Sequence, residues 1–196
     1  VSLALYDKRG KIGQKHHFSI SSSPDEGGVR LGIKIFGKFT QELSVKKEGD
    51  EIALFGPYGD FVFDAEKMKD VVFIAGGIGI TPFMSAFRCA ADRKLPNKMT
   101  LLYSNKTVDG TAFFDEIKAL AGQNNNFKPY FTVTNEIAPR GFEHGMLCQA
   151  TMQKFIANFS NKYFFICGPA PFMEAMAGCL RSCGVPENRI RREFFY

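Results

Sequence analysis

A glycine-rich segment is the part of the chain best suited to chemistry, because it leaves backbone amides bare where a helix is expected to begin. The segment Gly76-Gly77-Ile78-Gly79-Ile80-Thr81-Pro82 lies between an expected strand at 71–75 and a helical pattern at 82–92. Glycines allow a sharp turn and a close approach to a pyrophosphate, Thr81 suits the helix cap, and Pro82 suits the first helical position. The positive end of the helix dipole then faces the phosphates. The segment predicts a nucleotide site, and the alternative is a tight turn without a ligand.

Strands and helices alternate through the last two thirds of the chain. Apolar runs at 71–75, 100–104, 130–134, 163–167 and 190–195 are separated by helical patterns at 82–92, 111–121, 147–159 and 170–183. This rhythm is typical of a parallel sheet flanked by helices, and such sheets bind ligands at the carboxyl ends of their strands. The residues at those ends, besides the glycine-rich turn, are Ser104, Asn105, Lys106, Asn135, Glu136, Cys167, Gly168 and Pro169, with Glu193 inside the last strand.

The first third of the chain has a different pattern. Short β-rich runs at 1–5, 16–22, 29–36 and 51–55 are separated by turns at 25–28 and 48–50. Leu31, Ile33 and Ile35 alternate with polar or small neighbours, so one face of that strand should be buried. We expect a small antiparallel β-barrel at 1–66, followed by a Rossmann-like parallel sheet flanked by helices at 67–196. Because the chain opens directly on a strand pattern, we also expect barrel strands upstream of its first residue.

Composition narrows the classes of partner. The 196 residues, 45% of them hydrophobic, are enough to bury a core, and the net charge of +5 is mildly basic. Lys8, Arg9, Lys11 and Lys15 lie close together, either as a solvated edge or as a docking face for an acidic partner or membrane headgroups. A recognition pattern of aromatic and arginine residues is missing, so we expect no nucleic-acid partner.

The cysteines and the apolar runs indicate in which cellular compartment the protein works. Five cysteines without paired spacing argue against a disulfide framework and for a reducing compartment. The close grouping of an iron–sulfur motif is missing, and no metal site is expected. No apolar run approaches the ~18 residues that span a bilayer. We therefore expect a cytoplasmic protein, either free or at the cytoplasmic face of a membrane as part of a larger chain, and no feature sets its oligomeric state.

In their order along the chain, the motifs resemble those of the ferredoxin–NADP reductase superfamily, nearest to the dehydrogenase portions of ferric reductases and NADPH oxidases. The resemblance covers practically the whole chain. It joins a flavin motif, a turn for the flavin pyrophosphate, a loop that closes the barrel, and nicotinamide-nucleotide motifs with a C-terminal signature. These are His16-His17-Phe18-Ser19 with Ile20-Ser21-Ser22-Ser23-Pro24, Gly37-Lys38-Phe39-Thr40, Gly56-Pro57-Tyr58-Gly59, the segment at 76–82, Cys167-Gly168-Pro169, and Glu193 with Phe195.

The resemblance implies FAD and either NADPH or NADH as cofactors. Phe18 would lie against the isoalloxazine, and Ser19 would donate a hydrogen bond to the ring nitrogen that receives the hydride. Cys167 and Glu193 would line the gap where nicotinamide and flavin meet, with Glu193 orienting the carboxamide or passing a proton. The other implied contacts are His16, His17, Gly37, Lys38, Phe39, Thr40, Gly76, Gly77, Gly79, Thr81, Pro82, Ser104, Asn105, Lys106, Gly168 and Pro169, with Phe195 or Tyr196 covering the flavin.

Two positions depart from plant-type members of the superfamily. His16 stands where they have Arg, so the bidentate phosphate contact of a guanidinium is lost and flavin affinity should be lower. Thr134-Asn135 replaces the Ser-Arg pair of NADP users, although Lys106 or Arg140 could reach a 2′-phosphate, so NADH and NADPH both stay open.

The resulting prediction is an FAD-dependent NAD(P)H reductase that accepts a hydride and passes electrons singly to a haem, iron or redox-protein acceptor. The acceptor would be a haem-containing membrane domain joined upstream or a soluble electron-acceptor protein. The alternative is a non-catalytic nucleotide-binding regulatory or sensor module, which the replacement of Arg by His16 favours.

Overall fold

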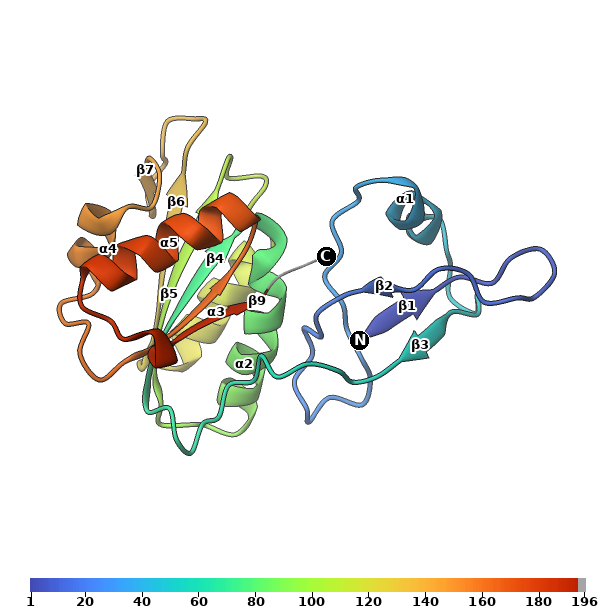
Figure 1. Ribbon diagram of the computed structural model, residues 1–196, viewed down its shortest axis with the longest axis horizontal. Coiled ribbons are helices and arrows are strands. Elements are labelled where there is room, and N and C mark those ends of the chain that lie inside the picture. The colour runs from blue at the N-terminus through green and yellow to red at the C-terminus, as the bar shows by residue number, and fades with distance from the viewer. Residues whose placement is uncertain (194–196) are drawn as a thin grey trace.

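Two sheets organise residues 1–193, which are the residues that the computed structural model describes (Figure 1). The first sheet is antiparallel with strand order β2-β1-β3, and the second is parallel with strand order β7-β6-β5-β4-β8-β9. The predicted fold class is therefore confirmed. The elements are β1 Ser2–Ala4, β2 His16–His17, α1 Lys38–Ser44, β3 Ala53–Phe55, β4 Asp70–Gly76, η1 Gly77–Ile80, α2 Thr81–Asp92, β5 Lys98–Asn105, α3 Phe114–Gln123, β6 Phe127–Val133, β7 Phe142–His144, α4 Gln149–Phe155, β8 Tyr163–Cys167, α5 Ala170–Ser182, η2 Glu187–Arg189 and β9 Ile190–Glu193.

The parallel sheet is covered on both faces, so its central strands are apolar throughout. Along β4, Val71 and Phe73 face one cluster of buried side chains, which α2 and α3 complete. Val72 and Ile74, which alternate with them, face a second cluster completed by α4 and α5. Side chains of successive strand residues point to opposite faces, so a continuous apolar run is what a doubly covered strand requires.

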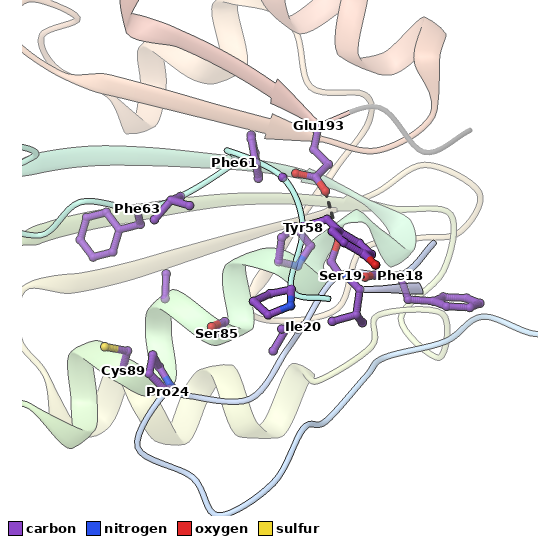
Figure 2. A pocket seen from close by; sticks show the side chains of 16 residues that line it. Phe18, Ser19, Ile20, Pro24, Tyr58, Phe61, Phe63, Ser85, Cys89 and Glu193 are labelled. Carbon is purple, nitrogen blue, oxygen red and sulfur yellow. Dashed lines mark hydrogen bonds between the residues drawn. The ribbon is translucent and has the colours of Figure 1, made fainter. Parts of the chain in front are cut away.

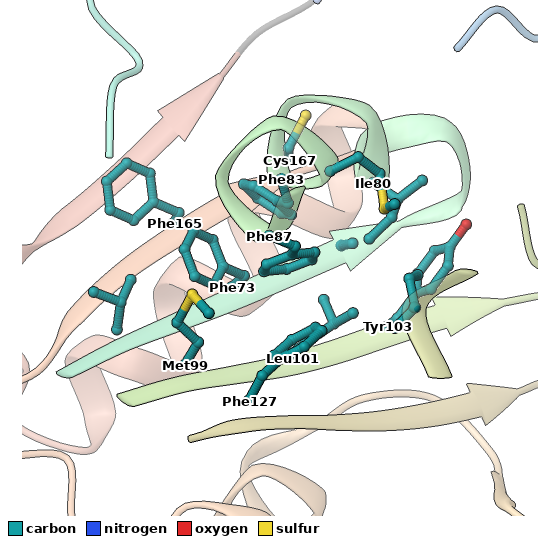
Figure 3. Close-up of a cluster of buried hydrophobic side chains, with 14 of the residues drawn as sticks. Phe73, Ile80, Phe83, Phe87, Met99, Leu101, Tyr103, Phe127, Phe165 and Cys167 are labelled. Atoms are coloured by element: carbon teal, nitrogen blue, oxygen red, sulfur yellow. The ribbon is translucent and has the colours of Figure 1, made fainter. Parts of the chain in front are cut away.

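Phenylalanine rings fill the first cluster (Figure 3). Phe73 is the hub, with ring centroids 5.1 Å from those of Phe83 and Phe87 and 5.6 Å from that of Phe165. The ring of Phe61 lies 5.1 Å from that of Phe165 and contributes from outside the sheet. Aromatic pairs at these separations stabilise a core beyond their buried area.

The antiparallel part has less regular structure than the sequence predicts. The segment at 29–36, expected as a strand, forms only an isolated bridge between Ile20 and Leu31, and Ile35 and Phe36 are exposed. The reason lies in Gly32, where a β-carbon would sit 2.4 Å from Cγ2 of Thr81. The segment packs against the start of α2 at this glycine, and it pairs with another segment only at the one bridge. The expected strand at 16–22 is likewise reduced to the two residues of β2.

One connecting segment joins the two sheets. β3 ends at Phe55 and β4 begins at Asp70, so the expected boundary between 66 and 67 falls within this segment. The amide of Asn97, which is buried, donates to the carbonyl oxygens of Ala65 (2.8 Å) and Met68 (2.9 Å) and holds the segment against the parallel sheet. Among residues 1–193, no helix is long and apolar enough to cross a membrane.

Candidate cofactor-binding site

A cavity of about 550 Å³ lies between the antiparallel part and the carboxyl ends of the parallel strands. One wall comes from the flavin motif and the segment at 32–36, and the other from the glycine-rich turn and the start of α5. Nine of its lining residues were predicted from the sequence, namely His17, Phe18, Ser19, Gly76, Gly77, Gly79, Thr81, Gly168 and Pro169. Two motifs that lie far apart in the sequence therefore face one another across a single space, which we call the interdomain cavity.

The glycine-rich turn packs tightly against the end of β8. A β-carbon on Gly79 would lie 2.3 Å from the carbonyl oxygen of Cys167, so only glycine fits there without moving backbone. The turn forms η1, and α2 begins at Thr81. The predicted capping role of Thr81 is wrong, because its hydroxyl donates to the carbonyl of Ile78 (3.1 Å) and Pro82 takes the second helical position. An extra 3₁₀ turn ahead of α2 is the cause.

Ser19 and Glu193 meet at the edge of the site. The Ser19 hydroxyl donates to Oε1 of Glu193 at 3.4 Å, although 174 residues separate them in the sequence (Figure 2). Glu193 is half-buried, and this burial raises the pKa of its carboxyl above its usual value, against the opposing effect of the Ser19 hydrogen bond. A carboxyl group that holds a proton more tightly than usual thus lies beside the hydroxyl for which the family resemblance implies a hydrogen bond to a ring nitrogen.

Cys167 lies beside Glu193 in the sheet but does not reach the interdomain cavity. The two residues are register partners between β8 and β9. The Cys167 side chain is fully buried in the first cluster, and that burial raises the pKa of its thiol. The expectation that Cys167 lines a gap is therefore corrected, since its side chain points into the core. Cys148, by contrast, is exposed, and hydrogen bonding with Thr151 lowers the pKa of its thiol.

A second cavity of about 410 Å³ shares Phe18 and Ser19 with the first (Figure 2). It lies between the segment at 18–24, helix α2 and the linker after β3. Glu193 lines this second cavity, as does Pro82. Glu193 therefore lines the second cavity and not the interdomain cavity, and Ser19, which lines both, joins them.

The predicted phosphate turn lies beside the flavin motif but outside both cavities. Gly37 has a φ of 84° and precedes α1, a conformation that favours glycine. The Thr40 hydroxyl accepts from the amide of Phe36 (2.7 Å) and donates to the carbonyl of Gly37 (3.1 Å), so it closes the turn. The rings of His16 and Phe39 stack at 3.9 Å. Lys38 is exposed and pairs with Glu42.

The predicted contacts after β5 lie outside the two cavities as well. Ser104 is partly buried, Lys106 is exposed, and Asn105 is buried with an Nδ2 atom that has no hydrogen-bond partner among the described residues. The backbone N–H of Asn135 donates to the backbone carbonyl of Lys106 at 2.9 Å, and this bond joins the segments that follow β5 and β6. Phe195 and Tyr196 lie outside the described residues.

Several lining residues of the interdomain cavity were missed by the sequence reading. They are Gly32, Ile33, Lys34, Phe36, Ile78, Ala170 and Met173. The apolar alternation within 29–36 predicts a half-buried strand and gives no indication of a cavity wall. The isolated Gly32 within that alternation was the available signal, because a glycine inside a strand pattern often marks a close approach of another element.

Solved structures share the fold of this chain. The FAD/NAD-binding domain of nitric oxide dioxygenase from Vibrio cholerae O1 biovar El Tor is 23% identical, with a TM-score of 0.86 over 99% of this chain and 82% of its own. The chain therefore shares its fold with this domain, and also with a ferredoxin NADP+ reductase from Neisseria gonorrhoeae that is 20% identical with a TM-score of 0.79 over 98% of this chain and 83% of its own. The model of the oxidoreductase NAD-binding domain family matches residues 73–178, and the chain belongs to that family.

Curated relatives match almost the whole chain. The flavohemoprotein of Halalkalibacterium halodurans is 27% identical over 199 residues, which is 91% of this chain and 46% of the relative. NADH-cytochrome b5 reductase 2 of Mycosarcoma maydis is 28% identical over 186 residues, which is 91% of this chain and 53% of the relative. The chain thus spans about half the length of the curated relatives it matches.

Proposed function

We propose that the chain is the cofactor-binding part of an FAD-dependent NAD(P)H oxidoreductase that passes electrons singly to a haem, iron or redox-protein acceptor. The observation that carries the proposal is the interdomain cavity, where Phe18 and Ser19 face the glycine-rich turn and Gly168. Membership in an oxidoreductase NAD-binding family supports the same class, as do relatives named flavohemoprotein and NADH-cytochrome b5 reductase.

The residues around the interdomain cavity fit both cofactors. Gly76, Gly77 and Gly79 expose backbone on one wall, and η1 with the 12-residue helix α2 directs backbone amides towards an anion. The opposite wall offers the rings of Phe18 and Phe36 to a flat apolar ligand. FAD, when bound, supplies the conversion of a two-electron hydride into single electrons.

The chain's own residues would hold and orient the cofactors and supply a proton. The hydrogen bond to Glu193 holds the Ser19 hydroxyl at the cavity edge, and the hydroxyl would turn away from Glu193 to donate its single proton to a ring nitrogen. Burial raises the pKa of the Glu193 carboxyl, which suits this group to pass a proton at the cavity edge. The tight packing of Gly79 on β8 fixes the turn. Cys167 supports the turn through its carbonyl group, against which Gly79 packs, while its thiol lies in the core.

The finer features are also proposed. NADPH or NADH is the donor, and the exposed Lys106 and Arg140 after β5 and β6 are the cations suited to a 2′-phosphate. The acceptor is a haem domain of the same protein or a separate redox protein, for which Lys8, Arg9 and Lys11 give an exposed basic surface. We place the reaction in the cytoplasm, free or at the cytoplasmic face of a membrane.

Flavin bleaching tests the proposal. Protein loaded with FAD is mixed without oxygen with NADH and, separately, with NADPH, and the flavin absorption is followed by stopped flow. We expect bleaching with at least one nucleotide, and a Ser19→Ala variant that binds FAD but is reduced about tenfold more slowly through the loss of one hydrogen bond. Protein that binds FAD and stays yellow with both nucleotides, or binds no FAD at all, would instead be a non-catalytic module.

A further inference from the structure

Arg88 lies in the middle of α2 and joins three segments of the chain. Its guanidinium is buried, with 8% of the side chain exposed. Nε and Nη2 donate to the two carboxylate oxygens of Glu116 on α3, at 2.6 and 2.8 Å, and Nη1 donates to the backbone carbonyl of Ser21. The hydrogen bond to Glu116 raises the pKa of Arg88, so the cation is permanent. A planar fork with its donors in fixed directions leaves the Ser21 carbonyl little freedom.

The segment that Arg88 holds is itself well ordered. Ser21, Ser22 and Ser23 are all buried. The Ser21 amide donates to the carbonyl of Arg30 at 2.8 Å, and the Arg30 amide donates to the Ser22 hydroxyl at 3.2 Å. Ser21 lies only two residues after Ser19. A displacement of the Ser21 carbonyl is therefore passed along a short, tied stretch of backbone to the Ser19 hydroxyl.

Helix α2 carries both the nucleotide turn and this contact. Thr81 at its first residue lines the interdomain cavity, and Arg88 follows seven residues later, about 10 Å along the axis at 1.5 Å per residue. The helix is one rigid element over that distance. Helix α2 therefore sets the position of Ser19 relative to the glycine-rich turn, because it contacts the segments that carry both.

We propose that Arg88 is a positioning residue, which fixes the segment at 19–25 so that Ser19 lies in register with the glycine-rich turn. This inference rests on the proposed function, because the register matters only if two cofactor rings meet in the interdomain cavity. Arg88 touches neither cavity and acts through the Ser21 carbonyl. Hydride transfer needs reacting atoms within roughly 3–3.5 Å, so a small shift of this wall is costly.

The same helix offers a matched control. Arg93, at the end of α2, forms a bidentate pair with Asp25 at 2.6 and 2.7 Å, and so reaches the same segment. Both side chains are about half exposed. Solvent screening makes such a surface pair worth little, about 0–1 kcal/mol. Arg88 and Arg93 therefore differ in burial and in closeness to Ser19 while sharing the helix and the segment that they contact.

The test compares Arg88→Lys and Arg88→Met with Arg93→Lys. Amide hydrogen exchange of the peptides covering 19–25 is measured first, without nucleotide or turnover. Flavin reduction is then followed at saturating nucleotide in the FAD-loaded fraction, alongside nucleotide affinity. For both Arg88 variants we expect faster exchange at 19–25 and a reduction rate lower by roughly 10- to 100-fold, with Kd for the nucleotide within about threefold. Arg93→Lys should leave the rate within about twofold of the wild type.

Two results would overturn the proposal. One is unchanged exchange at 19–25 in both Arg88 variants. The other is a normal reduction rate in their FAD-loaded fraction despite a lower melting temperature, which is what a merely structural arginine gives. Wild-type protein that neither nucleotide reduces refutes the proposed function instead, and the exchange measurement still decides whether Arg88 holds the segment. If Arg88→Lys does not fold alone, it is measured in a Gly178→Ala background, where the added methyl group meets nothing within 4 Å.

Discussion

Replacing Gly79 by alanine tests the packing of the glycine-rich turn on the parallel sheet. The added β-carbon would lie 2.3 Å from the carbonyl oxygen and 2.5 Å from the carbonyl carbon of Cys167. Ordinary contacts begin at about 3.4 Å, so the overlap is roughly 1 Å, and both atoms belong to backbone held in β8. Neither partner can rotate away. Overpacking of this kind costs about 1–3 kcal/mol, and we expect the upper end because the obstacle is a strand.

Thermal and urea unfolding give the assay. A loss of about 3 kcal/mol corresponds to a fall in Tm of roughly 6–12 °C for a domain of this size. Gly178→Ala in α5 is the matched control, because the same methyl group meets no atom within 4 Å and alanine is favoured in a helix by about 1 kcal/mol. The two substitutions should therefore shift Tm in opposite directions. A Gly79→Ala protein as stable as the wild type would show that the turn does not press on β8, and the argument for its fixed geometry would fail.

Three further outcomes are expected. Gly32→Ala places a methyl group 2.4 Å from the Thr81 side chain, so it should lower Tm by several degrees and weaken FAD binding, measured by flavin fluorescence quenching; unchanged values would mean that the two parts do not meet there. Burial raises the folded-state pKa of Glu193, so ionising this carboxyl lowers the stability of the fold as the pH rises above the ordinary glutamate pKa of about 4.3. The Tm of Glu193→Gln minus that of the wild type should therefore be near zero at about pH 4 and positive at about pH 7. A difference that does not change with pH would contradict the shift. Phe73→Ala removes the hub ring of the aromatic cluster and should cost about 3–5 kcal/mol in urea unfolding, whereas a loss below about 1 kcal/mol would show that the cluster repacks.

The parallel part was predictable because its signals are long and act locally. β4 and α2 begin and end within one residue of their expected bounds at 71–75 and 82–92. Each has enough residues for its periodicity to dominate. β7 was missed because its three residues lie between Gly141 and Gly145 and are too few to show a period.

The antiparallel part was harder to predict because tertiary contacts decide its shape. Leu31, Ile33 and Ile35 alternate as a strand would, yet packing of Gly32 on α2 takes the segment out of the sheet. The contact between Ser19 and Glu193 likewise depends on tertiary packing, which local sequence patterns do not give. Their types and motifs mark them as candidates, but a hydrogen bond across 174 residues depends on how β9 enters the sheet. The contact between Arg88 and the Ser21 carbonyl leaves no trace in the sequence at all.

The contrast between the buried Cys167 and the exposed Cys148 has a practical use. Thiolate is the reactive form, so a maleimide dye should attach first to Cys148, whose pKa is lowered, and leave Cys167 untouched. Cys148 precedes α4 and lines neither cavity. A fluorophore or spin label is therefore best directed to Cys148, as a reporter from which distances to a bound partner can be measured.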